Sequence, residues 1–551
     1  AAQQATSYRV YRSAAPIASV AGLTPIKTVG VLSGWNTEFY GRENNNSHTG
    51  ASFRYIVDRE TGDTPAAPLA RDTAVCAYNP PAAGLAHYAV TTVVNGVENT
   101  ALSAANTTSL VETVGDGVPI LQRVETRTNW YYTTGISTHY FFTRWESPPR
   151  SNTHGRAIDY MVVVPAKYNP ATPMPAIVSF HGWGGNMQGM SWWFNFDAGT
   201  IVVTSNQEPY DWWTGYHERS GLVARSQANW QGGVVRPYTQ NRINAFFDFV
   251  ASRWAIDRSR TILSGVSMGG SGSIMYSIRH ASRVAWCNSW VGVHIPAESP
   301  TFLSSYVGSY GDLDWNILFE DGVTPAFSWF DDDWYLRHHV AQDTPFLTFS
   351  NGKHATGIGW SQAAKFARAL QDTKRPHIFH WGQSGHNQRA ICPPNIDGVR
   401  EQAINPIDIR TDQSLPAFTR CSLDDNFGNG DPADGAASGQ LNAFLFWHTA
   451  DILDTPRSWA MTMGVVQTAP ATSCTVSLTP RRLQQLVVAP GAAFRWTNTA
   501  LATGAVVQSG TVVADVDGLL TIDGLALSLI TRTGGGNRVA LTAAGETFES
   551  G

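Results

Sequence analysis

Ser267 lies in a sequence pattern that is typical of a catalytic serine. Residues 265–269 read Gly-Val-Ser-Met-Gly, the G-x-S-x-G arrangement that places a serine on a sharp turn between a strand and a helix. On such a turn the hydroxyl is exposed and can attack a carbonyl carbon. Because the chain contains 50 glycines, the pattern alone is a weak signal, and a glycine turn with an incidental serine is the alternative.

The residues around Ser267 favour the catalytic interpretation. Residues 261–264 read as a short buried strand, and the predicted helix that follows opens with small residues, Gly269, Gly270, Ser271 and Gly272. Small residues are needed where the strand and helix backbones approach closely at the turn. The sequence therefore predicts a serine nucleophile held between a strand and a closely packed helix.

A serine nucleophile needs a base, and His386 has the placement for it. It follows the predicted strand 377–380, in a glycine-containing loop that reads Gln-Ser-Gly-His-Asn over residues 383–387. His338 and His339 read instead as packing or surface residues, and the H-E-x-x-H spacing of a zinc site does not occur. The expected chemistry requires no metal and no cofactor.

Residues 181–185, His-Gly-Trp-Gly-Gly, directly follow the predicted strand 176–180. A glycine-rich loop at this place can direct backbone N–H groups at the oxygen of the carbonyl that Ser267 attacks. We assign the N–H groups of Trp183 and Met268 as the two donors. The alternative interpretation of these residues is a plain turn from a strand to a helix.

Residues 116–460 read as an α/β domain with a mostly parallel sheet, because predicted strands alternate with amphipathic helices. The strands are predicted at 161–165, 176–180, 200–204, 261–264, 345–349 and 377–380. Two helices carry apolar residues at helical spacing, one with Ile243, Phe246, Phe247, Val250 and Trp254, the other with Ala363, Phe366, Ala367 and Leu370. A last helix, near residues 441–450, is predicted to close the domain.

The flanking regions, residues 1–115 and 465–551, read as β-rich modules. Strands are predicted at 8–12, 52–57 and 87–94 in the first, where Asn95-Gly96 supplies a hairpin turn, and at 494–496, 510–513, 519–522 and 538–541 in the second. The first module resembles an incomplete fibronectin type III sandwich, since two more strands would have to precede Tyr8. Residues 515–518, Asp-Val-Asp-Gly, predict a hairpin turn, because the other ligands of a calcium loop are missing.

Charge and composition exclude some classes of function. The net charge of −5 and the absence of a Lys/Arg cluster argue against a nucleic-acid partner, and no apolar run approaches the length of a membrane span. The first residues, Ala-Ala-Gln-Gln, fit a mature chain whose signal peptide has been removed. Few lysines, abundant Arg, Asn, Thr and Trp, and the β-rich flanks also favour an exported protein, secreted or periplasmic. The sequence does not indicate the oligomeric state.

The five cysteines cannot all pair within one chain. Cys392 and Cys421 flank a loop rich in Pro, Asp and Gly that follows His386, and we predict a disulfide between them. An exported location would favour this bridge, because such compartments are oxidising. The alternative is that all five cysteines are reduced and buried.

These motifs together resemble the α/β-hydrolases. The resemblance rests on residues 181–185, on Gly265 to Gly270, on Gly385-His386, and on residues 257–260 ahead of the predicted nucleophile strand. The nearest group is the secreted esterases that resemble feruloyl esterases and polyhydroxyalkanoate depolymerases, and the likeness covers about residues 116–460. It implies hydrolysis of an ester through an acyl-enzyme, with a plant polysaccharide ester or a polyester as the substrate.

The chain departs from that family at the acid of the catalytic triad. The family carries an aspartate in a Gly-x-x-Asp turn, after the strand that precedes the last helix and strand. Here residues 351–360 read Asn-Gly-Lys-His-Ala-Thr-Gly-Ile-Gly-Trp, so Ala355 takes the place of the expected aspartate. Three explanations stay open: a variant inactivated at position 355, a domain that has lost activity, or an acid from elsewhere, namely Glu298, Asp312, Asp314, Asp331, Asp332 or Asp333.

Tryptophans gather in the loops near the predicted strand ends, at Trp183, Trp192, Trp193, Trp212, Trp213 and Trp360. Indole faces stack on sugar rings and aromatic acyl groups, so the group predicts a bulky, ring-bearing substrate that is linked to a carbohydrate or polymer. The alternative for any one of them is core packing.

Two other functions stay open. One is a serine peptidase of the prolyl-oligopeptidase type, although no propeller-like repeat is visible in the N-terminal region. The other is a carbohydrate- or polymer-binding protein on an inactive hydrolase scaffold, which the alanine at position 355 favours. Peptide and ester substrates would separate the first from an esterase, and polymer binding without turnover would identify the second.

Overall fold

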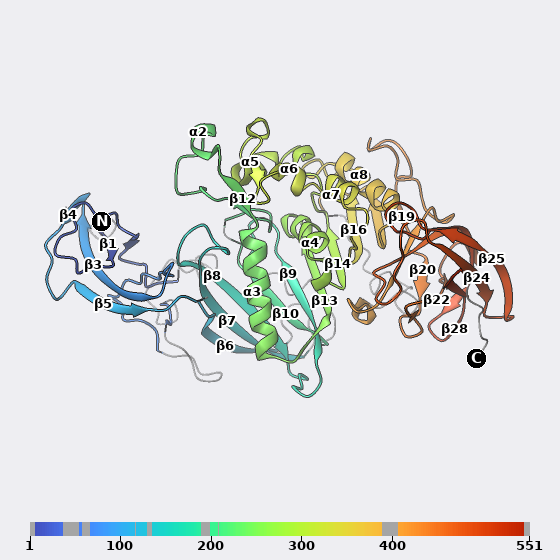
Figure 1. Cartoon of the computed structure of the whole chain (residues 1–551), viewed down its shortest axis with the longest axis horizontal. Helices are drawn as coiled ribbons and strands as arrows, with labels where there is room; N and C mark the ends of the chain where they lie inside the picture. Colours follow the sequence, from blue (N-terminus) through green and yellow to red (C-terminus); the bar gives the residue numbers. More distant parts are fainter. Residues whose placement is uncertain are drawn as a thin grey trace.

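The computed structural model describes residues 6–36, 54–57, 67–115, 117–128, 135–188, 199–207, 209–387 and 406–544. A ten-stranded sheet lies at the centre of the molecule, between two β-rich ends (Figure 1). Its strands run in the order β19-β17-β16-β14-β13-β9-β10-β8-β7-β6. Their bounds are β6 Ile120–Thr128, β7 Ile136–Glu146, β8 Arg156–Pro165, β9 Met174–Phe180, β10 Ile201–Ser205, β13 Ile256–Val266, β14 Trp286–Trp290, β16 Phe346–Gly352, β17 His377–Gly382 and β19 Gly439–Leu441.

The middle of the central sheet is parallel. Strands β10, β9, β13, β14, β16 and β17 pair in parallel, whereas β6, β7 and β8 at one edge and β19 at the other are antiparallel to their neighbours. Every strand predicted between residues 161 and 380 overlaps one strand of this sheet. The carboxyl ends of the parallel strands meet at one edge, which is where open α/β sheets bind ligands.

The two faces of the central sheet are covered by different kinds of structure. Successive side chains of a strand point to opposite faces. Leu263 and Phe379 pack with the helices on one face, whereas their chain neighbours Ile262 and Ile378 pack with the C-terminal strands on the other. In the described part of the chain, therefore, a β-rich layer covers the second face over strands β9, β13, β14, β16 and β17.

Helices cover the first face of the central sheet. They are α3 (Tyr238–Arg253), α4 (Met268–Arg279), α5 (Leu303–Tyr310), α7 (Asp332–His338) and α8 (Trp360–Asp372), with the short α2 (Gln227–Trp230) and α6 (Ala326–Trp329) nearby. The two helices predicted from apolar spacing are α3 and α8. A small sheet, β11 (Tyr216–His217), β12 (Val234–Arg236) and β15 (Leu318–Phe319), lies among their connections. None of the helices described has the length and apolar character that crossing a membrane requires.

The C-terminal β-rich region contains two main sheets. One has the order β18-β23-β26, and the other has β20-β22-β29-β24-β25 with β21 paired to β22. Strands β18 and β20 lie before residue 460 and pair with β23 and β22, so strand pairing crosses the boundary predicted at 460–465. The bounds are β18 Leu415–Thr419, β20 Leu445–Trp447, β21 Leu453–Asp454, β22 Ser458–Val465, β23 Ser473–Arg481, β24 Ala493–Ala500, β25 Ala505–Val513, β26 Ile522–Ser528 and β29 Asn537–Ala543.

The helix predicted near residues 441–450 is wrong. This stretch contains the end of β19 and the whole of β20, and all three residues of β20 are buried. A short apolar run fits a buried strand as well as a helix, so its sequence alone does not decide between them. The decision comes from β22, which is later in the chain and supplies the hydrogen-bonding partner of β20.

Two consecutive arginines fasten the C-terminal region to the central α/β region. Arg481 donates from Nε to Asp343 Oδ1 at 2.9 Å. Arg482 donates from Nη2 to the carbonyl oxygens of Val284 at 3.0 Å and Thr344 at 3.2 Å, in the loops that precede β14 and β16. Burial lowers the pKa of Arg482 to about 10. These contacts join the C-terminal region to the amino ends of two central strands.

The N-terminal region forms a separate five-stranded sheet. Its order is β2 (Lys27–Gly30), β1 (Thr6–Ser13), β3 (Gly84–Val94) and β4 (Val97–Asn99), and β5 (Thr107–Glu112) also pairs with β3. The predicted strands 8–12 and 87–94 lie in β1 and β3, and the hairpin turn between β3 and β4 has φ of 50° at Asn95 and 81° at Gly96. Residues 54–57, from the strand predicted at 52–57, form no strand beyond one isolated bridge.

The predicted disulfide between Cys392 and Cys421 is not observed, since Cys392 lies outside the described residues. Cys421 is a buried free thiol, as are Cys287 and Cys474, and the half-buried Cys76 is also free, so the described part of the chain contains no disulfide. A hydrogen bond with the Cys474 thiol, together with burial, raises the pKa of Cys421. Among the described residues, the cysteine that lies next to Cys421 is therefore Cys474.

Candidate active site

Ser267 forms the turn between β13 and α4, with φ of 57° and ψ of −120°. A residue with a side chain adopts such angles only at a cost of about 1–3 kcal/mol, so its surroundings must hold it there. The backbone N–H of Ser267 donates to Trp290 O at 2.8 Å, and its carbonyl accepts from the N–H of Ser271 at 2.9 Å and from the Ser271 hydroxyl at 3.1 Å. This is the strained, outward-facing turn that the sequence predicts for a nucleophile.

The small residues after Ser267 are required by close packing. A Cβ atom on Gly269 would lie 2.1 Å from Phe180 O, and one on Gly272 would lie 2.3 Å from the Cβ of Trp213. Both distances are far below a van der Waals contact, so neither position accepts a side chain. The prediction of a tightly packed helix after the serine agrees with this geometry.

His386 is hydrogen-bonded to Ser267. Its Nε2 atom lies 2.8 Å from Ser267 Oγ, although the two residues are 119 positions apart in the chain. The imidazole is open to solvent on one side, and partial desolvation lowers its pKa from 6.5 because burial disfavours the imidazolium. A neutral imidazole in this position can accept the hydroxyl proton of the serine.

Ala355 lies where a triad acid is expected, and no described carboxylate replaces it. Its loop packs against the loop of His386, because Lys353 N donates to Gly382 O at 2.9 Å and His354 N donates to Ser384 O at 3.2 Å. The Ala355 side chain is buried. Within the described ranges, no carboxylate forms a hydrogen bond or an ion pair with His386, and burial is the cause of its pKa shift.

Five of the six alternative acids lie in other surroundings. Glu298 and Asp312 form ion pairs, with Lys365 and with Arg225 respectively. Asp333 pairs with Arg337 at 3.0 Å. Asp331 caps α7 by accepting the N–H of Trp334, and Asp314 lies in the short helix 313–315. None of these side chains is placed against His386.

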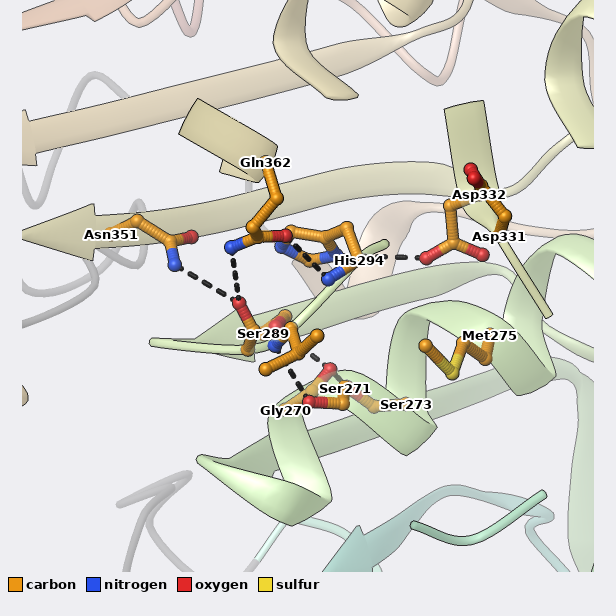
Figure 2. Close-up of polar contacts among 12 residues, drawn as sticks. Gly270, Ser271, Ser273, Met275, Ser289, His294, Asp331, Asp332, Asn351 and Gln362 are labelled. Atoms are coloured by element: carbon orange, nitrogen blue, oxygen red, sulfur yellow. Dashed lines mark hydrogen bonds and ion pairs between the residues drawn. The ribbon is translucent and has the colours of Figure 1, made fainter. Parts of the chain in front are cut away.

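Asp332, the last alternative acid, pairs with a different histidine. Figure 2 shows the Asp332 carboxylate beside His294, whose Nδ1 lies 3.6 Å from Asp332 Oδ2, and both side chains are fully buried. Asp332 also binds Arg279 at 2.9 Å. His294 belongs to the loop after β14, and this pair supports that loop rather than the Ser267–His386 pair.

The loop at residues 181–185 lies beside the nucleophile. A Cβ atom on Gly182 would come within 3.5 Å of Ser267 Cβ. Gly185 N donates to Gly182 O at 3.0 Å, which closes a turn with Trp183 at its second position. Neither the N–H of Trp183 nor that of Met268, the first residue of α4, has an acceptor among the described residues. Both amides are therefore available as the predicted oxyanion donors.

The predicted tryptophans divide into one exposed residue, three buried ones, and two that the structure does not describe. Trp183 is 51% exposed and lies 4.7 Å from the Tyr210 ring, centroid to centroid. The prediction that Trp212, Trp213 and Trp360 bind substrate is wrong, since all three are buried in the main core. Trp192 and Trp193 lie outside the described residues. Of the four described members of this group, Trp183 alone has an exposed ring that could contact a ligand.

A cavity of 410 Å³ opens beside the histidine loop, and both polar and apolar residues line it. Its lining includes His354, Gln383 and Asp431. Gln383 precedes His386 by three residues, and three extended residues span at most about 10 Å. This side of the cavity therefore lies within about 10 Å of His386, although neither His386 nor Ser267 lines the cavity. The sequence does not indicate this cavity, because Asp431 comes from a loop after the predicted catalytic residues. Among the described side chains, no group of three His, Cys, Asp or Glu residues could hold a metal ion.

The central part of this chain matches one family model. Residues 151–389 match the family model named Esterase, a segment that contains Ser267, His386 and residues 181–185. No curated protein matches the chain in sequence. The matched segment lies within the central α/β region and includes neither β-rich end.

Several solved structures resemble about half of this chain. An S-formylglutathione hydrolase from Agrobacterium tumefaciens is 16% identical, over 48% of this chain and 91% of that one, with a TM-score of 0.34. A fluorophosphonate-binding serine hydrolase from Staphylococcus aureus is 15% identical over 46% and 92%, with a TM-score of 0.34. A ferulic acid esterase from the anaerobic fungus Anaeromyces mucronatus is 12% identical over 48% and 92%, with a TM-score of 0.31.

Proposed function

We propose, from the premise that the central part of this chain is a serine esterase of the α/β-hydrolase superfamily, that it cleaves carboxylic esters at Ser267 through an acyl-enzyme. The observation that carries the proposal is the 2.8 Å contact between Ser267 Oγ and His386 Nε2 on a strained turn. A hydroxyl held against a neutral imidazole can lose its proton as it attacks a carbonyl carbon.

In the proposed first half-reaction, Ser267 Oγ bonds to the ester carbon while His386 Nε2 takes the hydroxyl proton. The carbonyl oxygen becomes an oxyanion that accepts hydrogen bonds from the N–H groups of Trp183 and Met268. His386 then gives its proton to the departing alcohol oxygen, and the ester C–O bond breaks. Water attacks the acyl-serine in the second half-reaction, and His386 again moves the proton.

We further propose that the ester joins a bulky, ring-bearing acid to a hydroxyl-rich alcohol, or belongs to a polymer such as a plant polysaccharide ester or a polyester. The exposed indole of Trp183, beside Tyr210, supports a flat acyl group near the oxyanion donors. The polar side chains His354, Gln383 and Asp431 of the cavity near the histidine loop support a hydrophilic alcohol, because His386 delivers its proton to the alcohol oxygen of the ester. An exported location also belongs to this proposal and rests on composition alone.

The alanine at position 355 leads us to propose that the chain is slow as it stands. An orienting carboxylate keeps the imidazole in the correct tautomer and stabilises the imidazolium, and its loss costs about 10⁴ in rate. Hydrolysis of a p-nitrophenyl ester should be measured for the parent chain, for Ala355→Asp, and for Ser267→Ala as the blank. We expect Ala355→Asp to raise the rate by roughly a thousandfold or more.

Two results would lead to different conclusions. If the parent chain is already fast and Ala355→Asp adds nothing, the acid comes from elsewhere and its assignment to position 355 is wrong. If the parent chain and Ala355→Asp both react no faster than the Ser267→Ala blank, the esterase proposal fails. A binding protein on an inactive scaffold would then be the better description, and it would retain a polysaccharide or polyester without turnover.

A further inference from the structure

The loop that carries the proposed oxyanion donor Trp183 rests on the segment 207–214. Gln207 N donates to His181 Nε2 at 3.1 Å, and Trp213 Nε1 donates to His181 O at 3.1 Å. Since Nε2 of His181 accepts a hydrogen bond, its proton is on Nδ1, which donates to Gly182 O at 2.8 Å. Three hydrogen bonds thus fix the first residue of the loop.

Both supports of His181 lead back to one buried carboxylate, Asp211. Asp211 Oδ1 accepts hydrogen bonds from Gln207 Nε2 and, at 3.1 Å, from Trp213 N. Asp211 Oδ2 accepts from the Thr239 hydroxyl of α3 at 2.6 Å. The backbone N–H of Asp211 also donates to Gln207 Oε1 at 3.2 Å. A single side chain therefore connects the two residues that hold His181.

The turn after Asp211 is strained and needs this support. Trp212 and Trp213 have φ of 60° and 63°, and consecutive left-handed residues with side chains are unfavourable. This backbone places the Trp213 ring parallel to Phe180, with centroids 4.2 Å apart, directly under the start of the loop. The hydrogen bond from Trp213 N to the carboxylate stabilises the conformation that puts the indole there.

Asp211 is a buried carboxylate whose presence lowers stability unless its hydrogen bonds are needed. It is fully buried, and within the described ranges it forms no ion pair. Burial raises its pKa to about 6, and the groups that face it are Arg242 of α3, which favours the charged form, and Tyr310 of α5. A buried carboxylate without a counter-ion is costly, whereas Asp332 in the same region is paired with Arg279.

We propose that Asp211 is a positioning residue of the oxyanion hole. Through Gln207 and Trp213 it holds His181, and His181 in turn fixes the turn that presents the N–H group of Trp183. This inference rests on the proposed function, because it gives the loop a purpose only if Ser267 forms a tetrahedral adduct. Asp211 touches neither Ser267 nor His386 and acts only through the loop.

The test uses a small alkyl fluorophosphonate, whose adduct on Ser267 places an oxygen in the oxyanion hole. Labelling of Ser267 is followed by intact mass, so that no substrate need be known. Removal of one oxyanion donor costs about 10²–10³ in rate, so we expect Asp211→Ala, which displaces the donor, to slow labelling by at least about tenfold. Asp211→Asn keeps the shape and an acceptor oxygen, and it should label within about threefold of the parent.

A matched control lies on the other side of the same turn. The Ser305 hydroxyl accepts from Trp212 Nε1 at 2.9 Å and does not touch the loop, so Ser305→Ala should label at the parent rate. Gln207→Ala removes the side-chain link while its backbone donor remains, and it should slow labelling. Combining it with Asp211→Ala should add little further loss, because both act through one connection. If Asp211→Ala does not fold, Gln207→Ala and Asp211→Asn carry the test.

The possible results separate this inference from the proposed function. If neither the parent protein nor Ala355→Asp is labelled at Ser267, the proposed function fails and this inference fails with it. If only Ala355→Asp is labelled, the same variants are compared in that background. If the parent is labelled, and folded Asp211→Ala or Gln207→Ala reacts at the parent rate, the inference about Asp211 alone is wrong. Slow labelling by Asp211→Ala with near-parental labelling by Asp211→Asn and Ser305→Ala would support it.

Discussion

The two β-rich ends of the molecule are attached to the central sheet in different ways. The C-terminal region shares one apolar core with that sheet, and Trp447 of β20 packs edge-on against Phe346 of β16 with ring centroids 5.2 Å apart. The N-terminal sheet has a small core of its own, around Tyr11, Val20 and Ala89. The first is thus a layer of the α/β fold, and the second is an appended unit.

The contacts of the N-terminal region with the central region are mainly polar. Lys27 of β2 donates to the carbonyl oxygens of His154 and Gly155 in the central region, at 3.2 and 2.7 Å, and to Ala77 O within its own region at 3.0 Å. The Tyr55 and Trp145 rings add an edge contact at 5.2 Å. The two ends are therefore alike in β-rich composition but differ in how they are attached. The apolar side chains of the C-terminal region pack against the central sheet, whereas those of the N-terminal sheet pack mainly with one another.

The largest expected effect is the loss of the shared core. Trp447→Ala should lower the free energy of unfolding by about 3–5 kcal/mol, because it leaves a cavity in the core beside Phe346. The temperature at which Ser267 stops reacting with a fluorophosphonate should fall together with the calorimetric transition. The matched variant Tyr11→Ala should destabilise the N-terminal sheet and leave that temperature unchanged. Equal falls in both variants would remove the distinction between the two ends.

The next effect concerns the arginine that joins the C-terminal region to the central loops. Arg482→Met should cost about 2–4 kcal/mol of stability, since it leaves the carbonyl groups of Val284 and Thr344 without their donor, less the gain from removing a buried charge. Chemical denaturation measures the change. Arg495→Met, at an exposed position of the same region, should stay within about 0.5 kcal/mol. Equal stability of the two variants would mean that the hydrogen bonds of Arg482 to Val284 and Thr344 do not stabilise the fold.

A smaller effect is expected at the other end. Lys27→Met should cost about 1–2 kcal/mol in the attachment of the N-terminal sheet, because the carbonyl groups of His154 and Gly155 lose their donor. Limited proteolysis should release the N-terminal sheet faster, while the thermal midpoint for Ser267 labelling remains that of the parent. A fall of this midpoint would mean that the N-terminal sheet supports the central fold after all.

The smallest effect of the N-terminal region should be on the pH dependence of ester hydrolysis, which we expect to depend on His386 alone. The pKa of His386 lies below 6.5. Ester hydrolysis should therefore stay constant through pH 6.5 and fall only at the lower pH where the imidazole becomes protonated. Lys27→Met should show the same acid limb as the parent. Ala355→Asp should move the limb to higher pH, since a carboxylate beside the ring favours the imidazolium. An unchanged limb in Ala355→Asp would place that aspartate away from His386.

Several parts of the site could be predicted because they are encoded locally. The turn of Ser267 needs small residues next to it in the chain, and the glycine-rich turn at 181–185 follows its own strand. His386 could be placed as well, because parallel strands bring their carboxyl ends to one edge. Each of these predictions depends on residues close together in the sequence, or on a rule of topology.

Other parts could not be predicted, because burial is decided by distant partners. Trp212 and Trp183 look alike in the sequence, yet Trp212 is buried against Tyr306 of α5, at a ring distance of 4.4 Å, whereas Trp183 faces solvent. Asp211 has no local motif, and its purpose emerges only from its contacts with Gln207, Trp213 and Thr239. The strand β20 was mistaken for a helix for the same reason.

The sequence by itself determined the candidate nucleophile and base, the glycine turn beside them and the alanine at position 355, because short motifs and strand periodicity specify these. Only the tertiary structure decided that the C-terminal strands form a layer of the central fold, that three of the tryptophans are core residues, and that Asp211 supports the loop beside Ser267. Local sequence specifies the backbone, but the environment of a side chain depends on residues tens or hundreds of positions away. Those residues come into contact only once the chain has folded.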